Sequence, residues 1–137
     1  MRDVAMTRRL KIVVADDERD TREYLQEYLS YCGHEVRAVE DGRQLVEVCR
    51  AFQPDLVITD DAMPGLGGWA AAEEVNRWRP VPVILLTGRD DAESRARAKG
   101  SPFVKVLTKP VKEAELRAAV ESVPPAGEAP ADRPAGG

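Results

Sequence analysis

The sequence of 137 residues is 43% hydrophobic and 32% charged, which is ordinary for a single globular domain of this length. A net charge of -4 and a pI of about 5.1 predict no direct binding of nucleic acid by this segment and no binding to anionic membranes. No apolar run approaches the roughly 18 residues of a membrane span and no signal peptide is visible, so we expect a cytoplasmic location.

Short apolar runs rich in β-branched residues alternate along the chain with stretches of helical periodicity. This alternation predicts a repeated strand–helix unit and a parallel sheet. We expect strands at residues 11–15, 34–39, 54–59, 81–86 and 103–107. We expect helices at residues 18–32, 43–52, 69–78, 90–99 and 112–123. Gly33 should end the first helix in a left-handed conformation, and the fourth helix has alanine as its only apolar residue.

The expected helices account for residues that might otherwise suggest a site. The inner stripe of the first helix should contain Tyr24 or Leu25, Tyr28, Leu29 and Cys32. Cys32 and Cys49 are expected to fill the core, and not to form a disulfide or a metal pair. Trp69 and Trp78 are expected to pack their helices. His34 lies at a strand start, away from the acidic residues, and we assign it no chemistry.

The domain boundaries follow from composition. Residues 1–9 are expected to be an N-terminal extension, residues 10–123 the folded domain, and residues 124–137 a disordered tail or linker rich in Pro, Ala and Gly. Five strand–helix units cannot close an eight-stranded barrel. We therefore expect an α/β fold, a doubly wound, flavodoxin-like parallel sheet with strand order 2-1-3-4-5.

Polar residues follow the expected strands at their carboxyl ends. They are Asp16 and Asp17, Asp60 and Asp61, Thr87 and Gly88, and Lys109 and Pro110. In open α/β sheets the ligand site lies outside these ends, and the expected order places the first and third strands side by side. Asp16, Asp17 and Asp60 should then converge, and at least one pKa should be raised unless a cation lies among them. Hard oxygen ligands with room for water and a phosphate favour Mg²⁺.

Each of these residues also has a plainer explanation when taken singly. Asp16 and Asp17 could cap a helix, because Asp favours helix starts. Asp60 and Asp61 could be solvated loop residues, and Lys109 a surface charge. Their occurrence together at one edge of the sheet favours a site for a divalent cation and a phosphoryl group.

With these motifs in order, residues 10–123 resemble the receiver domains of two-component response regulators. The matching motifs are Asp16-Asp17, Asp60-Asp61-Ala62-Met63-Pro64, Thr87-Gly88 and Lys109-Pro110. The resemblance implies that the chain accepts a phosphoryl group from a histidine kinase or histidine phosphotransfer protein and switches an unknown downstream target. It implies a phosphoacceptor that assists its own phosphorylation and dephosphorylation, and not an enzyme acting on an external substrate.

The resemblance also implies a role for each matched residue of the acidic cluster. Asp60 corresponds to the phosphoacceptor, because it lies three residues before the Met-Pro pair, and Asp61 is a bystander. Asp16 and Asp17 correspond to the metal pair, with Asp17 as the more direct ligand. Asp60 and the backbone carbonyl of Ala62 complete the site for Mg²⁺, with Mn²⁺ as an alternative ion.

The remaining matched residues would bind the phosphoryl group. Lys109 corresponds to the lysine that pairs first with the acceptor and then with the phosphoryl group, and the peptide bond to Pro110 corresponds to a cis bond. Thr87 corresponds to the hydroxyl that signals the switch, with Gly88 beside it. An aspartate can act as a covalent nucleophile, and a lysine neutralises charge on a transferring phosphoryl group.

Three positions concern the lifetime and output of the phosphorylated state. Ala62 and Arg89 should lie beside the phosphoryl group, where Ala62 is too small to position a water and Arg89 could pair with phosphoryl oxygens. The family usually has Tyr or Phe three residues before the lysine, whereas this chain has Val106. With no ring to move, activation should mainly order residues 88–102.

Two other function classes stay open at this stage. A haloacid dehalogenase-type phosphatase also uses Asp, Ser or Thr, and Lys on an α/β sheet, but it needs Asp-x-Asp after its first strand, where this chain has Asp16-Asp17-Glu18. The other alternative is an interaction domain with the same fold that acts without phosphorylation. Any DNA-binding output domain is expected to lie outside this sequence.

Overall fold

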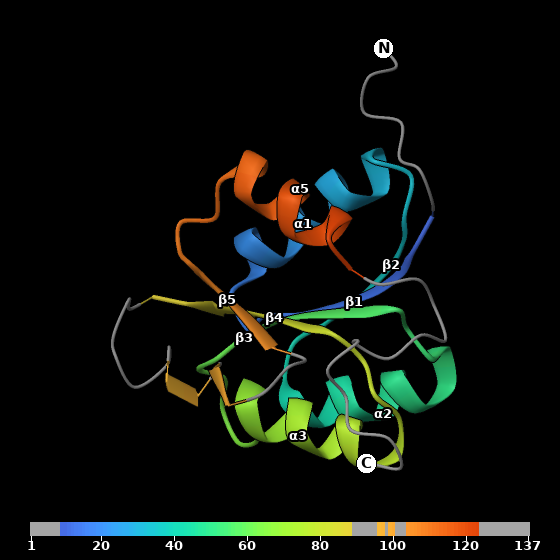
Figure 1. The fold of residues 1–137 in the computed structure, drawn as a ribbon, viewed down its shortest axis with the longest axis vertical. Coiled ribbons are helices and arrows are strands. Elements are labelled where there is room, and N and C mark those ends of the chain that lie inside the picture. Colours follow the sequence, from blue (N-terminus) through green and yellow to red (C-terminus); the bar gives the residue numbers. More distant parts are fainter. Residues whose placement is uncertain (1–8, 89–95, 98, 101–103, 124–137) are drawn as a thin grey trace.

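The protein is built around one parallel sheet with the strand order β2-β1-β3-β4-β5, the order expected from the sequence (Figure 1). The computed structural model describes residues 9–88, 96–97, 99–100 and 104–123. The strands are β1 (Lys11–Ala15), β2 (Glu35–Val39), β3 (Leu56–Asp60), β4 (Val83–Thr87) and β5 (Val104–Thr108). The helices are α1 (Arg19–Tyr31), α2 (Gly42–Phe52), α3 (Gly68–Trp78) and α5 (Glu113–Glu121).

Four strands begin later than expected from the sequence, and β2 does so by one residue, at Glu35 instead of residue 34. β4 starts at Val83 instead of residue 81, because Pro82 has no N–H to donate to a neighbouring strand. β3 starts at Leu56. The preceding residue, Asp55, is bound to Lys11 of β1: its main-chain N–H donates to the Lys11 carbonyl, and its carboxylate accepts from the Lys11 N–H. β5 is shifted by one residue and ends at Thr108.

The helix expected over residues 90–99 lies largely outside the described part of the chain. Within it, Ala96, Arg97 and Lys99 are helical. The expected extension over residues 1–9 and the tail over residues 124–137 also lie outside it, apart from Arg9.

Two layers of helices cover the sheet, and each encloses a separate hydrophobic core (Figure 1). On one face, α1 and α5 pack Leu25 and Leu116 against Ile12 of β1. On the other face, α2 and α3 pack Leu45 and Val75 against the opposite side of the sheet. Alternate strand residues belong to opposite cores, so β1 and β3 are buried on both faces, which explains their continuous apolar runs.

The core confirms most of the expectations for single residues. Cys32 and Cys49 are free thiols buried in the core. Leu25, and not Tyr24, lies in the inner stripe of α1: Leu25 is fully buried, whereas Tyr24 is 38% exposed and stacks on Tyr28. Trp78 is also 38% exposed and lies under the guanidinium of Arg50. In the described part of the chain, every helix is too short or too polar to cross a membrane.

His34 holds the beginning of β1, a role that the sequence did not reveal. It follows Gly33, whose φ of 103° ends α1 as expected. The His34 side chain is buried, and its Nδ1 accepts a hydrogen bond of 3.0 Å from the main-chain N–H of Leu10. This bond joins the turn after α1 to the residue that precedes β1.

We expect the substitution His34→Leu to lower the free energy of unfolding by about 1–3 kcal/mol, because the buried N–H of Leu10 loses its acceptor. Urea unfolding at neutral pH measures this change. Tyr31→Leu is the matched control, since Tyr31 is 65% exposed. The control should change the same free energy by less than about 0.5 kcal/mol, and an equally small effect of His34→Leu would contradict the structural role.

Candidate functional site

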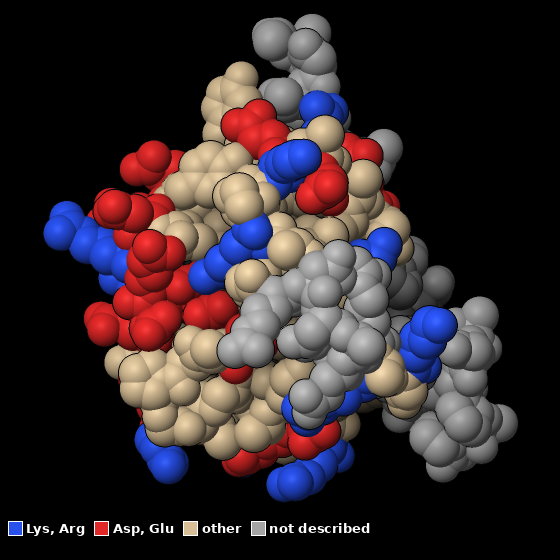
Figure 2. All heavy atoms as spheres, turned by 90° about the vertical axis from the view of Figure 1, so that its left-hand side faces the viewer, with Lys and Arg blue, Asp and Glu red and all other residues tan. Residues whose placement is uncertain are grey.

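The carboxyl ends of the strands bring together the acidic residues identified in the sequence. β1 and β3 are neighbours in parallel register, with Ala15 opposite Thr59, so the residues that follow each strand lie side by side. Carboxylate oxygens of Asp16, Asp17 and Asp60 all lie within 4.8 Å of one another. Figure 2 views the molecule from this edge of the sheet and shows acidic side chains gathered on one flank of it.

The buried carboxylates of Asp16 and Asp60 both contact the ammonium group of Lys109. Asp16 is fully buried and Asp60 is 7% exposed. The Lys109 ammonium Nζ lies 3.1 Å from Asp16 Oδ2 and 3.3 Å from Asp60 Oδ1. Asp16 is also held locally, because its Oδ1 accepts a hydrogen bond of 2.9 Å from the main-chain N–H of Glu18.

The electrostatics of the site follow from this arrangement. Burial raises the pKa of the Asp60 carboxyl, and the charge of Asp16 adds to the rise, while Lys109 opposes it. One carboxyl thus has a raised pKa, as expected, but burial and not the crowding of the carboxylates is the main cause. For Lys109, burial alone would lower the pKa, but its contacts with Asp16 and Asp60 outweigh burial and raise it. Lys109 is therefore a cation at neutral pH.

The donor set fits a hard divalent cation such as Mg²⁺. Asp16 Oδ2 is buried and, among the described residues, has no hydrogen-bond partner beyond its ion pair with Lys109. Asp17 is exposed, and in the described part of the chain its carboxylate has no ion pair or hydrogen bond. The carboxylate oxygens of Asp16, Asp17 and Asp60 thus lie close together and are of the type that Mg²⁺ prefers as ligands.

Thr87 and Lys109 come from the ends of neighbouring strands. Thr87 is buried at the end of β4, and its carbonyl accepts a hydrogen bond of 2.8 Å from the main-chain N–H of Lys109. The Lys109–Pro110 peptide bond is cis. Gly88, directly after Thr87, is exposed. Hydroxyl, ammonium and carboxylates therefore lie along the same edge of the sheet.

The positions expected to influence lifetime and output are only partly described. Ala62 is exposed beside the acidic cluster, and Arg89 lies outside the described residues. Val106 is half-buried in the middle of β5, opposite Leu85 of β4. It supplies no aromatic ring at this position.

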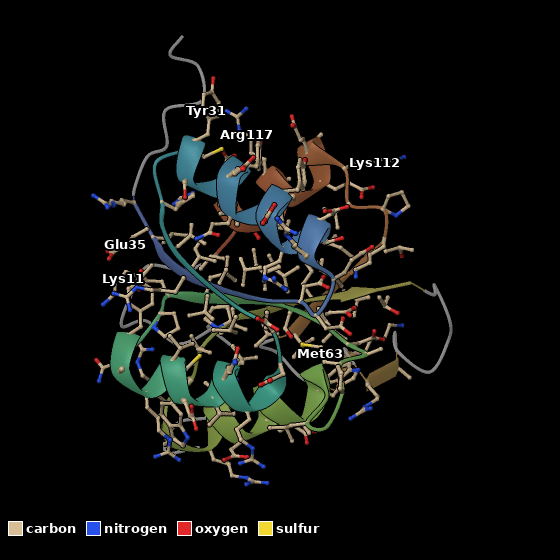
Figure 3. All side chains as sticks on the ribbon, turned by 180° about the vertical axis from the view of Figure 1, so that it is seen from behind. Lys11, Tyr31, Glu35, Met63, Lys112 and Arg117 are labelled. Carbon is tan, nitrogen blue, oxygen red and sulfur yellow. The ribbon has the colours of Figure 1, made fainter. Side chains whose placement is uncertain are left out.

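Gly68 is a residue of the site that the sequence analysis did not identify. A side chain on Gly68 would overlap the carbonyl oxygen of Asp60. The Gly68 N–H donates to the carbonyl of Asp61 over 3.3 Å, so α3 starts directly against the acidic loop. Met63 anchors the same loop in the core against α2 and α3 (Figure 3). The adjacent glycines 67 and 68 were the available signal.

We expect Asp60→Asn to raise the free energy of unfolding of the cation-free protein at neutral pH. The raised pKa means that the folded protein holds the Asp60 proton to a higher pH than the unfolded chain, so ionisation of the buried carboxyl opposes folding. Near about pH 3 both states are protonated and the gain should vanish. The gain should grow as the pH rises through the raised pKa and then stay constant.

Urea unfolding of both proteins in a chelator across this pH range measures the difference. Asp61→Asn removes the same charge one residue away and is the control, because among the described residues Asp61 does not pair with Lys109. A gain for Asp60→Asn that is independent of pH would contradict the electrostatic explanation.

Comparison with known proteins agrees with the geometry. The family described as response regulator receiver domain matches residues 12–121. The transcriptional regulatory protein HprR of Escherichia coli is 33% identical over 113 residues, which is 82% of this chain and 51% of HprR. The probable transcriptional regulator ycf27 of Porphyridium aerugineum is 33% identical over 113 residues, covering 82% of this chain and 47% of ycf27.

Solved structures show the same similarity. A response regulator receiver domain protein from Clostridium thermocellum superimposes with a TM-score of 0.76 at 30% sequence identity, covering 82% of this chain and 92% of that chain. The chain spans about half the length of the curated relatives that it matches.

Proposed function

The chain belongs to the response regulator receiver domain family, and on that basis we propose that Asp60 accepts a phosphoryl group from a histidine kinase or histidine phosphotransfer protein. The observation that carries this proposal is the bridge from Lys109 to the two buried carboxylates of Asp16 and Asp60. We take residues 10–123 as the functional unit. Family membership gives no support to the haloacid dehalogenase-type alternative.

The site contains the groups that phosphoryl transfer requires. An oxygen of the ionised Asp60 carboxylate attacks phosphorus, the new O–P bond forms, and the bond from phosphorus to the donor's imidazole nitrogen breaks. Lys109 already lies 3.3 Å from Asp60 Oδ1 and is placed to pair with an oxygen of the transferred group.

Four groups would hold Mg²⁺: the carboxylates of Asp16, Asp17 and Asp60 and the backbone carbonyl of Ala62. When bound, the cation would neutralise the charge that develops on the phosphoryl oxygens. Asp17 is the most exposed of the three carboxylates, so it can change its orientation at least cost when a cation enters. Mn²⁺ would use the same oxygen ligands.

The phosphoryl donor would approach over a groove beside Lys109. The groove has a volume of about 460 Å³ and lies between the first turns of α1 and the chain that follows β5. Tyr24 and Leu25 line one side, and Pro110 and Val111 line the other. A mainly apolar groove next to the acceptor suits a protein partner that presents a phosphorylated side chain.

Phosphorylation would add roughly 1.5 to 2 negative charges at the acidic edge. Thr87 and Gly88 would bind the new oxygens, and Lys109 would move from the carboxylate pair toward the phosphoryl group. Because Val106 supplies no ring, we propose that output depends on ordering of residues 88–102. We also propose that Arg89 modulates the lifetime of the phosphorylated state. Arg89 and most of residues 88–102 lie outside the described residues. The relatives are about twice as long and are named transcriptional regulators, so we place DNA binding outside this segment.

The test of the acceptor is intact-mass analysis after incubation with acetyl phosphate, with and without Mg²⁺. The wild type should gain one phosphoryl group only with Mg²⁺, and Asp60→Asn should gain none. Asp61→Asn is the matched control and should still be labelled, because its carboxylate does not pair with Lys109 in the described structure. Loss of labelling in Asp61→Asn alone would show that the acceptor is misassigned, and no labelling of wild type would support an interaction domain.

Asp17→Asn should weaken Mg²⁺ binding, because it removes a ligand and part of the attraction for the cation. We expect a rise in the Mg²⁺ dissociation constant of about tenfold or more by calorimetric titration. The melting temperature of the cation-free protein should stay the same or rise, since the carboxylates repel one another without a cation. A large fall in that temperature would instead identify Asp17 as a structural helix-start residue.

A further inference from the structure

We propose that Arg22 of α1 is a positioning residue for the cation site, acting through the main chain that carries Asp16 and Asp17. This inference rests on the proposed function. Arg22 Nη1 donates a hydrogen bond of 2.8 Å to the main-chain carbonyl oxygen of Asp16. Arg22 itself is half-buried, and it lies in the turn of α1 directly above the acidic loop.

The peptide group held by Arg22 is the one that joins Asp16 to Asp17. Because a peptide group is planar, fixing the direction of the Asp16 carbonyl also fixes the direction in which the chain enters Asp17. Asp16 is held at its other polar atoms: its N–H donates to Val39, and its carboxylate contacts Glu18 and Lys109. The Asp17 carboxylate has no such contact among the described residues, so its position depends on this peptide.

Arg22 is placed so that it does not compete with a cation. It donates to a carbonyl, and leaves the carboxylate oxygens of Asp16 and Asp17 available. Lys109 does the opposite, because it occupies one oxygen each of Asp16 and Asp60. The two basic residues therefore contact different chemical groups of the same loop.

Helix stability does not explain an arginine at this position. A positive charge near a helix N-terminus is unfavourable with respect to the helix dipole. Arg19, in the first turn of α1, offsets this cost by an ion pair of 3.0 Å with Glu23. The Arg22 guanidinium instead donates to the carbonyl of Asp16, which points to a role in shaping the acidic loop.

Charge and positioning predict opposite effects of removing Arg22. If Arg22 acted only through its charge, Arg22→Met would strengthen Mg²⁺ binding, because one repelling cation is gone. If Arg22 positions Asp17, the same substitution should raise the Mg²⁺ dissociation constant by about tenfold, as is usual when a group that orients a metal ligand is lost. Arg22→Lys keeps the charge and a donor on a shorter side chain, so it should restore part of the affinity.

The experiment is calorimetric titration of the cation-free chain with MgCl₂, at low and at high salt, together with melting by circular dichroism. Arg19→Met is the matched control, since it removes the same charge from the same helix, and among the described residues the Arg19 guanidinium pairs with Glu23 and not with the acidic loop. We expect Arg19→Met to change the dissociation constant by less than about twofold. The loss in Arg22→Met should persist at high salt, where interactions between exposed charges are screened.

Three results would overturn the inference. They are unchanged or tighter Mg²⁺ binding by folded Arg22→Met, an equal loss in Arg19→Met, and a lower melting temperature with an unchanged dissociation constant. If Arg22→Met does not fold, the same comparison is made with Arg22→Lys, for which Mg²⁺ binding as tight as in the wild type overturns it. Failure of the proposed function looks different, because the wild type would then neither bind Mg²⁺ nor be labelled on Asp60.

Discussion

The repulsion between the buried carboxylates of Asp16 and Asp60 is the constraint on which the rest of the structure depends. The strand order makes β1 and β3 neighbours, and their ends place both carboxylates in a nearly water-free volume. Lys109, from the last strand, offsets that repulsion by contacting both. Removing Lys109 would leave both buried carboxylates without a partner, and breaking a buried ion pair in this way typically costs about 3–5 kcal/mol.

The main chain around this unit is fixed by residues that carry no chemistry of their own. Gly68 allows α3 to start against the carbonyl of Asp60. Arg22 holds the carbonyl of Asp16 from α1. Each contact fixes the backbone of a loop that bears a carboxylate and leaves the carboxylate oxygens available. The backbone of the acidic edge is therefore held by contacts that do not involve the carboxylate oxygens.

On the surface of the protein, several arginines stack on aromatic rings. Arg97, in the described part of the chain after β4, stacks over Trp69 of α3 at 4.3 Å and lies 3.9 Å from Glu73. Such contacts are partly exposed and each is worth about 0.5–1 kcal/mol.

Local pattern was sufficient for the five strands, for α1, α2, α3 and α5, and for the acidic edge. Alternating apolar runs and turn residues specify β1 to β5, and the polar residues after each run specify the edge, because both depend on neighbours in the chain. Hydrogen bonds between elements could not be predicted from the local pattern. The bonds from Leu10 to His34 and from Arg22 to Asp16 join residues whose proximity depends on how the elements pack. Exposure of Tyr24 beside buried Leu25 was likewise decided by packing, since both lie near the same helical stripe and only one can face α5 and the sheet.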